Sequence, residues 1–502
     1  MKVRELIDGF DEIQLNSEPP DFSIHAILSD SRLCREKDIF CLYETEPDKS
    51  VRYIQNAYEN GTRIFLIPED YSIDLPTQSL TLLRSKISPR YLHGFLSSKL
   101  CGHPSHDLSI FAVTGTNGKT STTSLLYHTY QIAGIPSGLI GTISIHFRNE
   151  KISSQYTTPD PWELQSTLKR MKEEGIKAVF LEASSHGLKL HRLNGIELDG
   201  ALFTNLTPDH RDFHPTFEDY FESKFHLFHL LSQSSKKNKL AVLSKDSPGG
   251  NEMLSGIRKE NFDFKTFTLG SDMDSYRIKN LRLSLDGSEF DLESPDASSK
   301  LSVNTSLLGE FNSLNLSLSM ILLQNLGFSK SQLEAWIPKL SPIEGRFQLV
   351  YPASRDRVGI VDYAHTPDAL ENILSTIQKI PHSRLITVFG CGGDRDKKKR
   401  PEMGAIAQKY SDVTIITSDN PRTEDPLMII QDIMKGIDPD HKNCIQIPDR
   451  REAIVRAVKI LPENGFLLVA GKGHENYQIL GTERIHFSDY EELSKAFLAN
   501  NE

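Results

Sequence analysis

One segment, Leu108–Ser121, constrains the fold more than any other part of this chain. It begins with an apolar run typical of a strand, continues through a turn with two glycines and a lysine, and enters a stretch with helical spacing. Glycines in such a turn let the backbone approach a phosphate, and the free amides at the helix start point at the anion. The segment therefore predicts a phosphate loop in an α/β domain, with Lys119 at the β- and γ-phosphates and Thr120 at a Mg²⁺ ion.

The loop departs from the common pattern at one position. Val113 stands before Gly118 where the first glycine of the pattern is usual. A plain strand-to-helix turn is the alternative interpretation of the segment. The flanking strand and helix patterns favour the phosphate loop, which by itself indicates only that a nucleotide is bound.

Length and charge limit the remaining possibilities. A chain of 502 residues is expected to form roughly two to four domains, and a net charge of −10 argues against nucleic acid as the main partner. No apolar stretch approaches the length of about 18 residues that spans a membrane, and the N-terminus carries acids where a signal peptide is apolar. Five scattered cysteines without a Cys-x-x-Cys pair are typical of a reducing compartment and argue against structural zinc. We therefore expect a cytoplasmic protein without membrane insertion.

Residues 1–100 predict a first α/β domain. Apolar runs indicate buried strands at 38–42 and 63–67, and helical patterns cover 53–60 and 91–99. A polar linker after the second helix places the first boundary near residue 100.

Residues 101–340 predict a second α/β domain, built around the phosphate loop. Glu182 directly follows one predicted strand, and His210 comes shortly after the next. Because ligands bind beyond the carboxyl ends of strands in open parallel sheets, both side chains should share one rim with Lys119. A carboxylate and an imidazole beside a phosphate loop suit a divalent ion that bridges phosphate oxygens, although each alone is more often a solvated side chain. The strands of this domain are expected at residues 138–145, 178–181 and 201–206.

Two segments of this domain carry local signals. Pro159 excludes Thr158 from helical geometry, and Asp160 can cap a helix that starts directly after it. Residues 216–231 predict a helix with an apolar stripe of phenylalanines. From spacing alone, Lys224 beside that stripe is interpreted as a snorkelling lysine.

The remainder of the second domain offers less chemistry. Residues 236–306 alternate strand-like runs with Ser/Asp/Gly turns, and we interpret them as an antiparallel extension. The helix predicted after Leu308 carries Asn312 and Asn315 on one face, where they either meet a base or cap the helix.

Residues 341–502 predict a third domain of Rossmann type. Its strands are expected at residues 358–361, 385–389, 413–417 and 466–469. A polar cluster follows each strand, and such a density is hard to explain by packing. The basic run Lys397–Arg400 after the second cluster is interpreted as solvated. The clusters are Asp362–Asp368, Gly390–Asp396, Asp419–Arg422 and Gly471–Glu475.

These motifs resemble those of the Mur ligases, the family that builds the peptide of bacterial cell-wall precursors. The resemblance covers nearly the whole chain and implies an N-terminal uridine-substrate-binding α/β domain, a central P-loop ATPase-like domain with a parallel sheet, and a C-terminal Rossmann-like domain. The motifs that carry it are Thr-Gly-Thr-Asn-Gly-Lys-Thr, Thr-Thr-Pro, Glu-Ala-Ser-Ser-His, Asn-Leu-Thr-x-Asp-His, Asp-Tyr-Ala-His-Thr-Pro-Asp, Gly-Gly-Asp-Arg-Asp, Asp-Asn-Pro-Arg and Gly-Lys-Gly-His-Glu.

The resemblance implies roles for the matching residues. Lys119, His210 and Lys224 would be catalytic, and Lys224 matches a lysine that carries a CO₂-derived carbamate in the family, which replaces the snorkelling interpretation. ATP would be bound by Thr114, Gly115, Thr116, Asn117, Gly118, Lys119, Thr120, Asn312, Arg346, Asp362 and His365. Mg²⁺ would be held by Thr120, Glu182, His210 and Lys224. The UDP-muramyl substrate would contact Ser31, Thr157, Thr158, Ser184 and Arg192, and the incoming amino acid Arg395, Asp419, Asn420, Pro421, Arg422, Gly471 and Glu475.

The activity implied is ATP-dependent amide ligation. The D-glutamyl carboxylate of UDP-N-acetylmuramoyl-L-Ala-D-Glu would be phosphorylated, and the amine of meso-2,6-diaminopimelate would attack the acyl phosphate. Arg422 would bind the second carboxylate of that amino acid, because lysine-adding relatives lack this arginine. The alternatives are a lysine-adding ligase, a folylpolyglutamate-synthase-like ligase and a nucleotide-dependent switch without ligase chemistry. We expect a monomer with no nucleic-acid partner.

Two features depart from the family pattern. Leu190 stands where related enzymes often have a glutamine, and Thr45–Ser50 replaces the usual glycine- and histidine-rich uridine loop. The contacts to uridine and sugar therefore stay open.

Overall fold

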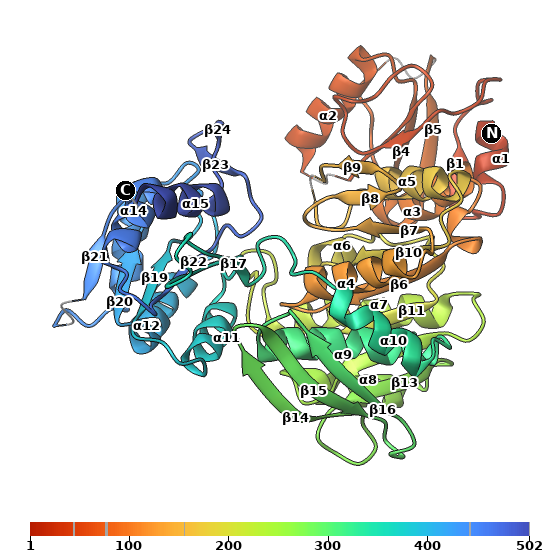
Figure 1. The fold of residues 1–502 in the computed structure, drawn as a ribbon. Helices are drawn as coiled ribbons and strands as arrows, with labels where there is room; N and C mark the ends of the chain where they lie inside the picture. The colour runs from red at the N-terminus through yellow and green to blue at the C-terminus, as the bar shows by residue number, and fades with distance from the viewer. Residues whose placement is uncertain (44–45, 76–78, 155, 441–442, 501–502) are drawn as a thin grey trace.

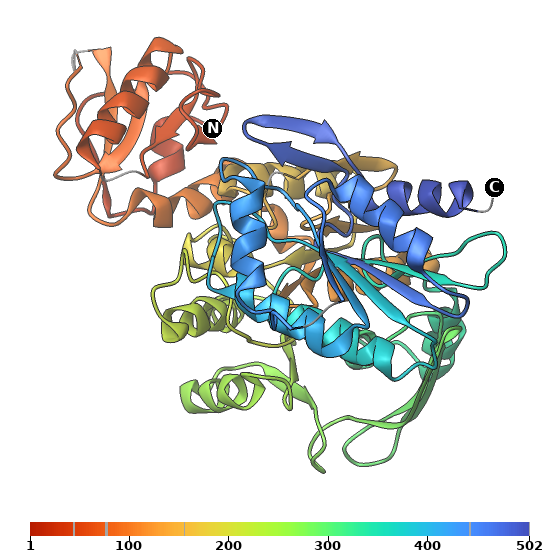
Figure 2. The same cartoon turned by 90° about the vertical axis from the view of Figure 1, so that its left-hand side faces the viewer.

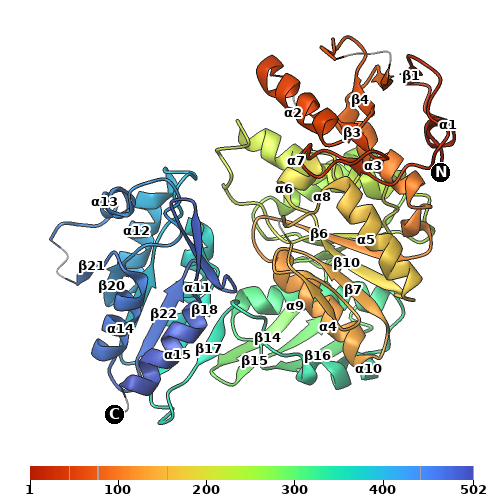
Figure 3. The same ribbon diagram turned by 90° about the horizontal axis from the view of Figure 1, so that it is seen from above.

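The computed structural model describes residues 1–43, 46–75, 79–154, 156–440 and 443–500, which form three α/β units (Figure 1). The predicted fold class is confirmed, whereas the boundaries near residues 100 and 340 stay predictions. Figures 1 and 3 show the C-terminal unit beside the central unit, with α11 (Pro367–Gln378) on the facing side. Figure 2 shows the N-terminal unit set apart at one corner of the molecule. In the described residues, no helix is long and apolar enough to cross a membrane.

The N-terminal unit is built on a five-stranded sheet in the order β1-β5-β4-β3-β2. Strands β2 to β5 run parallel, and β1 pairs antiparallel with β5. Its central strands are buried on both faces, between α2 on one side and α1 and α3 on the other, which explains their continuous apolar runs. The elements are α1 (Val3–Ile7), β1 (Ile13–Leu15), β2 (Ile27–Leu28), β3 (Ile39–Cys41), α2 (Pro47–Glu59), β4 (Ile64–Pro68), β5 (Thr81–Ser85) and α3 (Pro89–Leu100).

Two expectations for this unit need correction or limits. Helix α2 begins at Pro47 rather than residue 53, because a proline fits the first turn of a helix, where no backbone donor is needed. Of the segment that departs from the family's uridine loop, Thr45 lies outside the described residues, Glu46 immediately precedes α2, and 47–50 form the first turn of that helix. Ser29 ties the unit to the central unit, since its hydroxyl donates to Asp160 at 2.9 Å.

The central unit has an eight-stranded sheet in the order β13-β12-β11-β6-β10-β7-β8-β9, parallel from β13 to β7. Apolar clusters fill both faces of this sheet. Asp160 caps α5 as predicted, accepting from the backbone N–H of Trp162. The strands are β6 (Ser109–Thr114), β7 (Ser137–Ile140), β8 (Ile145–Phe147), β9 (Glu150–Ile152), β10 (Ala178–Glu182), β11 (Gly200–Phe203), β12 (Leu240–Ser244) and β13 (Lys265–Leu269). The helices are α4 (Lys119–Ile132), α5 (Pro161–Glu173), α6 (Ser185–Lys189), α7 (Phe217–Gln233), α8 (Gly250–Glu260), α9 (Glu310–Asn325) and α10 (Lys330–Trp336), with 3₁₀ turns η2 (Pro104–His106) and η3 (Ile337–Lys339).

Two predictions for this unit are wrong in part. The single strand expected at 138–145 is two antiparallel strands, β7 and β8, separated by a turn. The antiparallel extension expected over 236–306 holds only for the sheet of β14 (Arg277–Ser284), β15 (Gly287–Glu293) and β16 (Lys300–Thr305). Before it, β12, α8 and β13 continue the parallel sheet. The uninterrupted apolar run of β12, buried at every position, is the signal of a parallel strand that the turn-rich composition obscured.

The C-terminal unit has a six-stranded sheet in the order β17-β18-β22-β19-β20-β21, of which only β17 is antiparallel. The four predicted strands are present. The strands are β17 (Gln348–Val350), β18 (Val358–Asp362), β19 (Leu385–Phe389), β20 (Val413–Ile416), β21 (Cys444–Gln446) and β22 (Phe466–Ala470), followed by the hairpin β23 (Tyr477–Leu480) and β24 (Glu483–His486). Besides α11, the helices are α12 (Lys399–Tyr410), α13 (Pro426–Met434), α14 (Arg450–Ile460) and α15 (Asp489–Ala499).

The prediction that Lys397–Arg400 is a solvated run is wrong for Arg400. Its side chain is fully buried and pairs with Glu424 at 2.9 Å and Asp432 at 3.0 Å. Both carboxylates lie later in the chain. Residues 397–400 alone therefore gave no sign that the charge of Arg400 is neutralised by buried partners.

Candidate active site

The carboxyl ends of β11, β6 and β10 lie side by side, as the strand order requires. This arrangement brings the phosphate loop, Glu182 and the segment around His210 to one rim, which confirms the predicted juxtaposition. The rim faces a cavity of about 470 Å³ whose other wall is the C-terminal unit. Lys119, His210 and Lys224 line it from the central side.

The backbone angles and close packing of the phosphate loop require glycine at two positions. Gly115 and Gly118 have φ angles of +149° and +88°. A Cβ at Gly115 would lie 1.9 Å from the Thr204 hydroxyl, and one at Gly118 would lie 2.5 Å from the Asn315 side-chain oxygen. A larger residue at either position would displace the loop. Thr114 is buried in the strand before it, and Thr116 bonds the Thr207 carbonyl at 3.0 Å.

Two lysine ammonium groups converge on the same loop carbonyl. Lys119 Nζ donates to the carbonyls of Gly115 and Thr116, each at 2.8 Å, and Lys224 Nζ donates to Gly115 at 2.8 Å. Burial lowers the pKa of Lys119. Burial, reinforced by the nearby charge of Lys119, lowers the pKa of Lys224 well below its usual range. The snorkelling interpretation of Lys224 is wrong, because its side chain is only 1% exposed.

Glu182 is the carboxylate at the base of the rim. It accepts from the Thr120 hydroxyl at 2.9 Å, and from both the hydroxyl and the backbone N–H of Thr142 at 2.9 Å. Sequence reasoning missed Thr142, because that residue lay inside a segment interpreted as strand. Carboxylate and hydroxyl oxygens are the donors that Mg²⁺ prefers, so this pair fits that ion.

His210 lies among other aromatic rings beside the cavity. Its backbone has a φ angle of +53°. The centroids of the His210 and His186 rings lie 4.8 Å apart in an edge-to-face arrangement, and a carboxylate oxygen of Asp209 lies 3.4 Å from His210 Nε2. Burial lowers its pKa to about 3, against the opposing charge of Asp209. The imidazole is therefore neutral at physiological pH and offers a lone pair.

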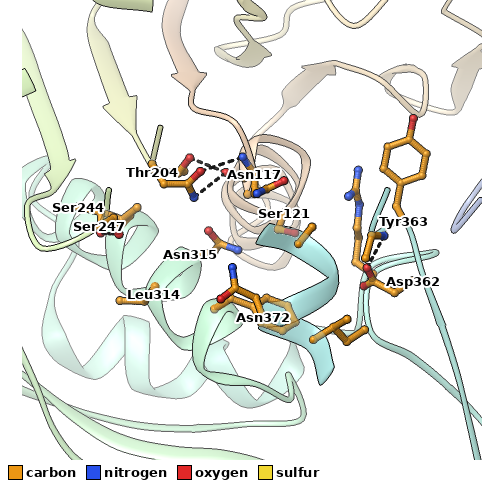
Figure 4. A pocket seen from close by; sticks show the side chains of 18 of the residues that line it. Asn117, Ser121, Thr204, Ser244, Ser247, Leu314, Asn315, Asp362, Tyr363 and Asn372 are labelled. Carbon is orange, nitrogen blue, oxygen red and sulfur yellow. Dashed lines mark hydrogen bonds between the residues drawn. The ribbon is translucent and has the colours of Figure 1, made fainter. Parts of the chain in front are cut away.

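A second, smaller pocket opens between the phosphate loop, α9 and the start of α11 (Figure 4). Asn117, Gly118, Arg346, Asp362 and His365 line it, together with Asn315. Asn312 does not, since its amide donates to the Leu308 carbonyl at 2.8 Å inside the helix start. Of the two asparagines considered on this helix, Asn315 is the one that faces the pocket.

The C-terminal wall of this pocket is held by short backbone contacts. Asp362 accepts from the N–H groups of Phe347 and Ala364 at 2.7 Å each, and burial raises its pKa. Burial lowers the pKa of His365 to about 4. Arg346 crosses between units, donating to the Thr120 hydroxyl at 3.2 Å.

Asn117 also joins the two units. Its side-chain amide donates to Asp368, in the first turn of α11, at 2.7 Å. The phosphate loop is thus connected to the C-terminal unit beside both pockets.

The residues predicted for the muramyl substrate separate into three groups. Thr157, Ser184 and Arg192 line the large cavity. Thr158 lies behind them, with its hydroxyl donating to the Glu182 carbonyl at 2.8 Å and its own carbonyl accepting from Arg192 at 2.8 Å. Ser31 is buried in the N-terminal unit and is not a lining residue of this cavity.

Most residues predicted for the amino acid meet on the opposite wall. Pro421 does not line it, because its carbonyl packs against Gly393, where a Cβ would lie 1.9 Å away. Arg422, at φ +52°, donates to the Gly393 carbonyl at 2.8 Å. The lining set is Arg395, Asp419, Asn420, Arg422, Gly471 and Glu475.

A fully buried lysine that sequence reasoning overlooked organises this wall. Lys472 Nζ lies 3.1 Å from Glu475, 3.2 Å from the Asn420 side-chain oxygen and 3.8 Å from Asp419. Burial, followed by the charge of Asp419, raises the pKa of Glu475. The position of Lys472 within Gly-Lys-Gly-His-Glu was a signal that could have identified it. Tyr477, another lining residue, had no comparable signal.

Known proteins match this architecture over its whole length. Family models for the Mur ligase middle domain and for the Mur ligase glutamate ligase domain match residues 113–323 and 345–473. The chain is 46% identical over 502 residues to UDP-N-acetylmuramoyl-L-alanyl-D-glutamate--2,6-diaminopimelate ligase of Leptospira borgpetersenii serovar Hardjo-bovis, with 99% of each chain covered.

Solved structures extend the comparison. One of a UDP-N-acetylmuramoyl-L-alanyl-D-glutamate--2,6-diaminopimelate ligase aligns with a TM-score of 0.69 at 32% identity, covering 100% of this chain and 99% of that one. A folylpolyglutamate synthase of Mycobacterium tuberculosis aligns with a TM-score of 0.62 at 15% identity, covering 75% of this chain and 91% of that one, and shows a common fold alone. With both family models matched and 46% identity along the full chain, the protein belongs to the Mur ligase family.

Proposed function

We propose that this ligase joins meso-2,6-diaminopimelate to the D-glutamyl carboxylate of UDP-N-acetylmuramoyl-L-Ala-D-Glu, with ATP as the energy source, in peptidoglycan precursor synthesis. The observation that carries the proposal is the cavity that unites Lys119 and Lys224 of the central unit with Arg422 and Glu475 of the C-terminal unit. The Leptospira relative named for this reaction, 46% identical over the full chain, supports it.

Residues of the central unit would activate the D-glutamyl carboxylate. Lys119 and the loop amides would bind the γ-phosphate, which the D-glutamyl carboxylate attacks in line to give ADP and an acyl phosphate. The smaller pocket, with Asn315, Asp362 and His365, would take the adenosine end. The amine then attacks the acyl carbon and loses a proton, and phosphate leaves as the amide forms. The cavity wall formed by the C-terminal unit would keep water from the acyl phosphate.

Glu182, Thr120 and His210 are the proposed protein donors for magnesium. When bound, Mg²⁺ would neutralise phosphate charge during transfer. Lys224 is proposed to react with CO₂, losing a proton and gaining a carbamate. Its lowered pKa supports this step, because only the neutral amine attacks CO₂. A carbamate there would convert a buried cation into an anion beside Lys119.

Arg422 and Glu475 are the proposed selectors of the amino acid. A guanidinium fork suits the second carboxylate of diaminopimelate, and Glu475 with Asp419 suits its ammonium group. A lysine substrate would leave Arg422 without its anion, which distinguishes this proposal from the lysine-adding alternative. Glutamate, the amino acid added in folylpolyglutamate synthesis, has a second carboxylate but no second ammonium group, and such a ligase is not expected to carry the Asp-Asn-Pro-Arg motif or the N-terminal unit.

The remaining proposals concern the contacts to the UDP-muramyl substrate, the cellular location and the oligomeric state. Ser31 in the N-terminal unit, with Thr157, Thr158, Ser184 and Arg192, would contact the UDP-muramyl substrate. We propose a cytoplasmic monomer that has no nucleic-acid partner, in keeping with the net charge of −10.

The test follows one oxygen atom. UDP-N-acetylmuramoyl-L-Ala-D-Glu with ¹⁸O in the D-glutamyl carboxylate is incubated with ATP, Mg²⁺ and diaminopimelate. The masses of the products are then measured by mass spectrometry. We expect amide product together with phosphate that carries one ¹⁸O atom. Amide product with unlabelled phosphate would exclude the acyl phosphate, and absence of amide product would exclude the ligase assignment.

A further inference from the structure

The C-terminal side of the large cavity carries the residues predicted to bind the amino acid, and we call it the amino-acid wall. Two of its loops follow different strands of the sheet. The segment Ser418–Asn420 follows β20, and Gly471 follows β22, with β19 lying between these strands. The loops nevertheless touch, because a Cβ at Gly471 would lie 2.8 Å from the Asp419 carboxylate. The spacing between the loops therefore determines the shape of this wall.

One side chain beneath the wall contacts both loops. Arg450, in the first turn of α14, donates from Nη1 to the Ser418 carbonyl at 3.2 Å and from Nη2 to the Ala470 carbonyl at 2.9 Å. Asp419 and Gly471 are the residues that directly follow these two carbonyls, and both line the large cavity. A shift of the guanidinium would be transmitted to each loop through a single peptide unit.

The guanidinium is itself fixed by a buried carboxylate. Asp489, at the start of α15, accepts from Arg450 Nε and Nη2 at 2.7 Å each, and both side chains are 0% exposed. Buried ion pairs are weak evidence for stability, because desolvation offsets much of their attraction. A planar fork held on one edge by a carboxylate presents its remaining donors in fixed directions, which an ammonium group cannot reproduce.

We propose that Arg450, oriented by Asp489, is a positioning residue for the amino-acid substrate. It sets the separation of the Asp419–Asn420 and Gly471 loops and thereby the affinity for the incoming amino acid, without touching the substrate. This inference rests on the proposed function for the identity of that substrate.

Steady-state kinetics of the full chain provide the test. Arg450→Lys and Asp489→Asn are compared with wild type, measuring KM separately for diaminopimelate, ATP and the UDP-muramyl dipeptide. We expect the KM for diaminopimelate to rise about tenfold or more in both variants, since displacements near 1 Å have effects of this size or larger. The other two KM values should stay within about twofold, because their predicted contacts lie on other elements.

The neighbouring residue supplies a matched control. Arg451 joins the same two helices through Glu492 at 2.7 Å, but its side chain is 59% exposed and contacts the Glu492 carboxylate and the Phe487 ring rather than the two loops. Arg451→Lys should leave all three KM values near those of wild type.

Backbone hydrogen exchange gives a second measurement that does not depend on the substrate. Arg450→Lys and Asp489→Asn should speed exchange in peptides covering Ser418–Asn420 and Gly471 and leave peptides of β18 unchanged. If wild type turns over with another amino acid, or none, the proposed function fails, while faster exchange confined to these loops still supports the positioning role.

The proposal is overturned by either of two results. The first is an unchanged KM for diaminopimelate in Arg450→Lys together with unchanged loop exchange. The second is a variant that loses affinity for all three substrates alike or fails to fold, because the ion pair then serves the whole unit rather than the amino-acid wall.

Discussion

The two walls of the large cavity treat buried charge in opposite ways. On the central wall, Lys119 and Lys224 donate to backbone carbonyls of the phosphate loop. Within the described residues, neither ammonium group has a carboxylate at ion-pair distance. On the C-terminal wall, Lys472 is as buried as Lys224, yet it lies 3.1 Å from Glu475 and 3.8 Å from Asp419.

This difference indicates what each wall requires of its ligand. The central wall holds cations whose pKa values are lowered and which gain their counter-charges only when anions arrive. The C-terminal wall already contains both signs of charge and needs a substrate that fits among them. We infer that the first wall is organised for phosphate transfer and the second for recognition.

The largest effect should come from Lys119, the cation assigned to the transferred phosphate. Lys119→Met keeps most of the side-chain volume and removes the charge. We expect kcat to fall about 10³-fold or more, because a positioned cation acts on charge that develops in the transition state. Single-turnover phosphate release measures the effect, and retention of more than a tenth of wild-type kcat would refute the role of this lysine.

Arg422 should have the next largest effect, and on selectivity rather than rate. A lysine substrate would leave this guanidinium unpaired, a loss of roughly 2–5 kcal/mol, or about 30- to several-thousandfold in specificity. Arg422→Ala should therefore reduce the preference for diaminopimelate over lysine by that factor. The measurement is the ratio of kcat/KM for the two amino acids. If wild type uses both equally well, or the variant keeps the ratio, the lysine-adding assignment replaces ours.

Lys224→Ala tests whether the central wall requires an added anion. We expect roughly a hundredfold loss of turnover, with part of it regained when short carboxylic acids are supplied in place of the carbamate. Acetate titration of the variant, with wild type as control, measures this recovery. Near-normal turnover of Lys224→Ala in CO₂-free buffer would show that the lysine has no such role.

The smallest effect concerns pH and the C-terminal wall. Because the pKa of Glu475 is raised above its usual value of 4.5, the neutral form persists to higher pH than for an ordinary glutamate. Binding of the substrate ammonium requires the carboxylate, so kcat/KM for the amino acid should decline as pH falls, starting above the usual glutamate range.

Glu475→Gln should remove this decline, and the exposed Glu483→Gln on the hairpin should keep it. The readout is the pH profile of kcat/KM for diaminopimelate at saturating ATP. A profile that is identical in wild type and Glu475→Gln would mean that another group titrates.

Local patterns predicted the central wall well and the C-terminal wall incompletely. The phosphate loop and Glu182 were predictable because each belongs to a short motif at the end of an apolar strand. Arg400 was not, because its carboxylate partners approach it only when separate segments of the chain pack together. Lys472 stood in a recognisable motif beside Glu475, but its approach to Asp419 also requires two loops to pack. Asn315 lines the smaller pocket whereas the Asn312 amide donates to the Leu308 carbonyl, a difference that depends on packing, and the assignment of Asn312 to ATP stays a prediction.

The same limit applies to the sheet. Residues 240–269 have strand-like runs between turns, a composition shared by antiparallel hairpins and by parallel strands with a short crossover helix. The pairing of β12 with β11 is a long-range contact that no local pattern contains. Ser31 gives an example that involves two units. Whether it lies near the large cavity depends on how the N-terminal unit is placed against the central unit, which no local sequence pattern specifies.

The central claim is that phosphate transfer on one wall is linked to amide formation on the other. Phosphate release by wild type, measured with ATP and Mg²⁺ while the UDP-muramyl dipeptide and diaminopimelate are omitted in turn, tests it most directly. The account predicts sustained release only when both are present. Rapid, steady release from ATP alone, unchanged by either cosubstrate, would contradict it.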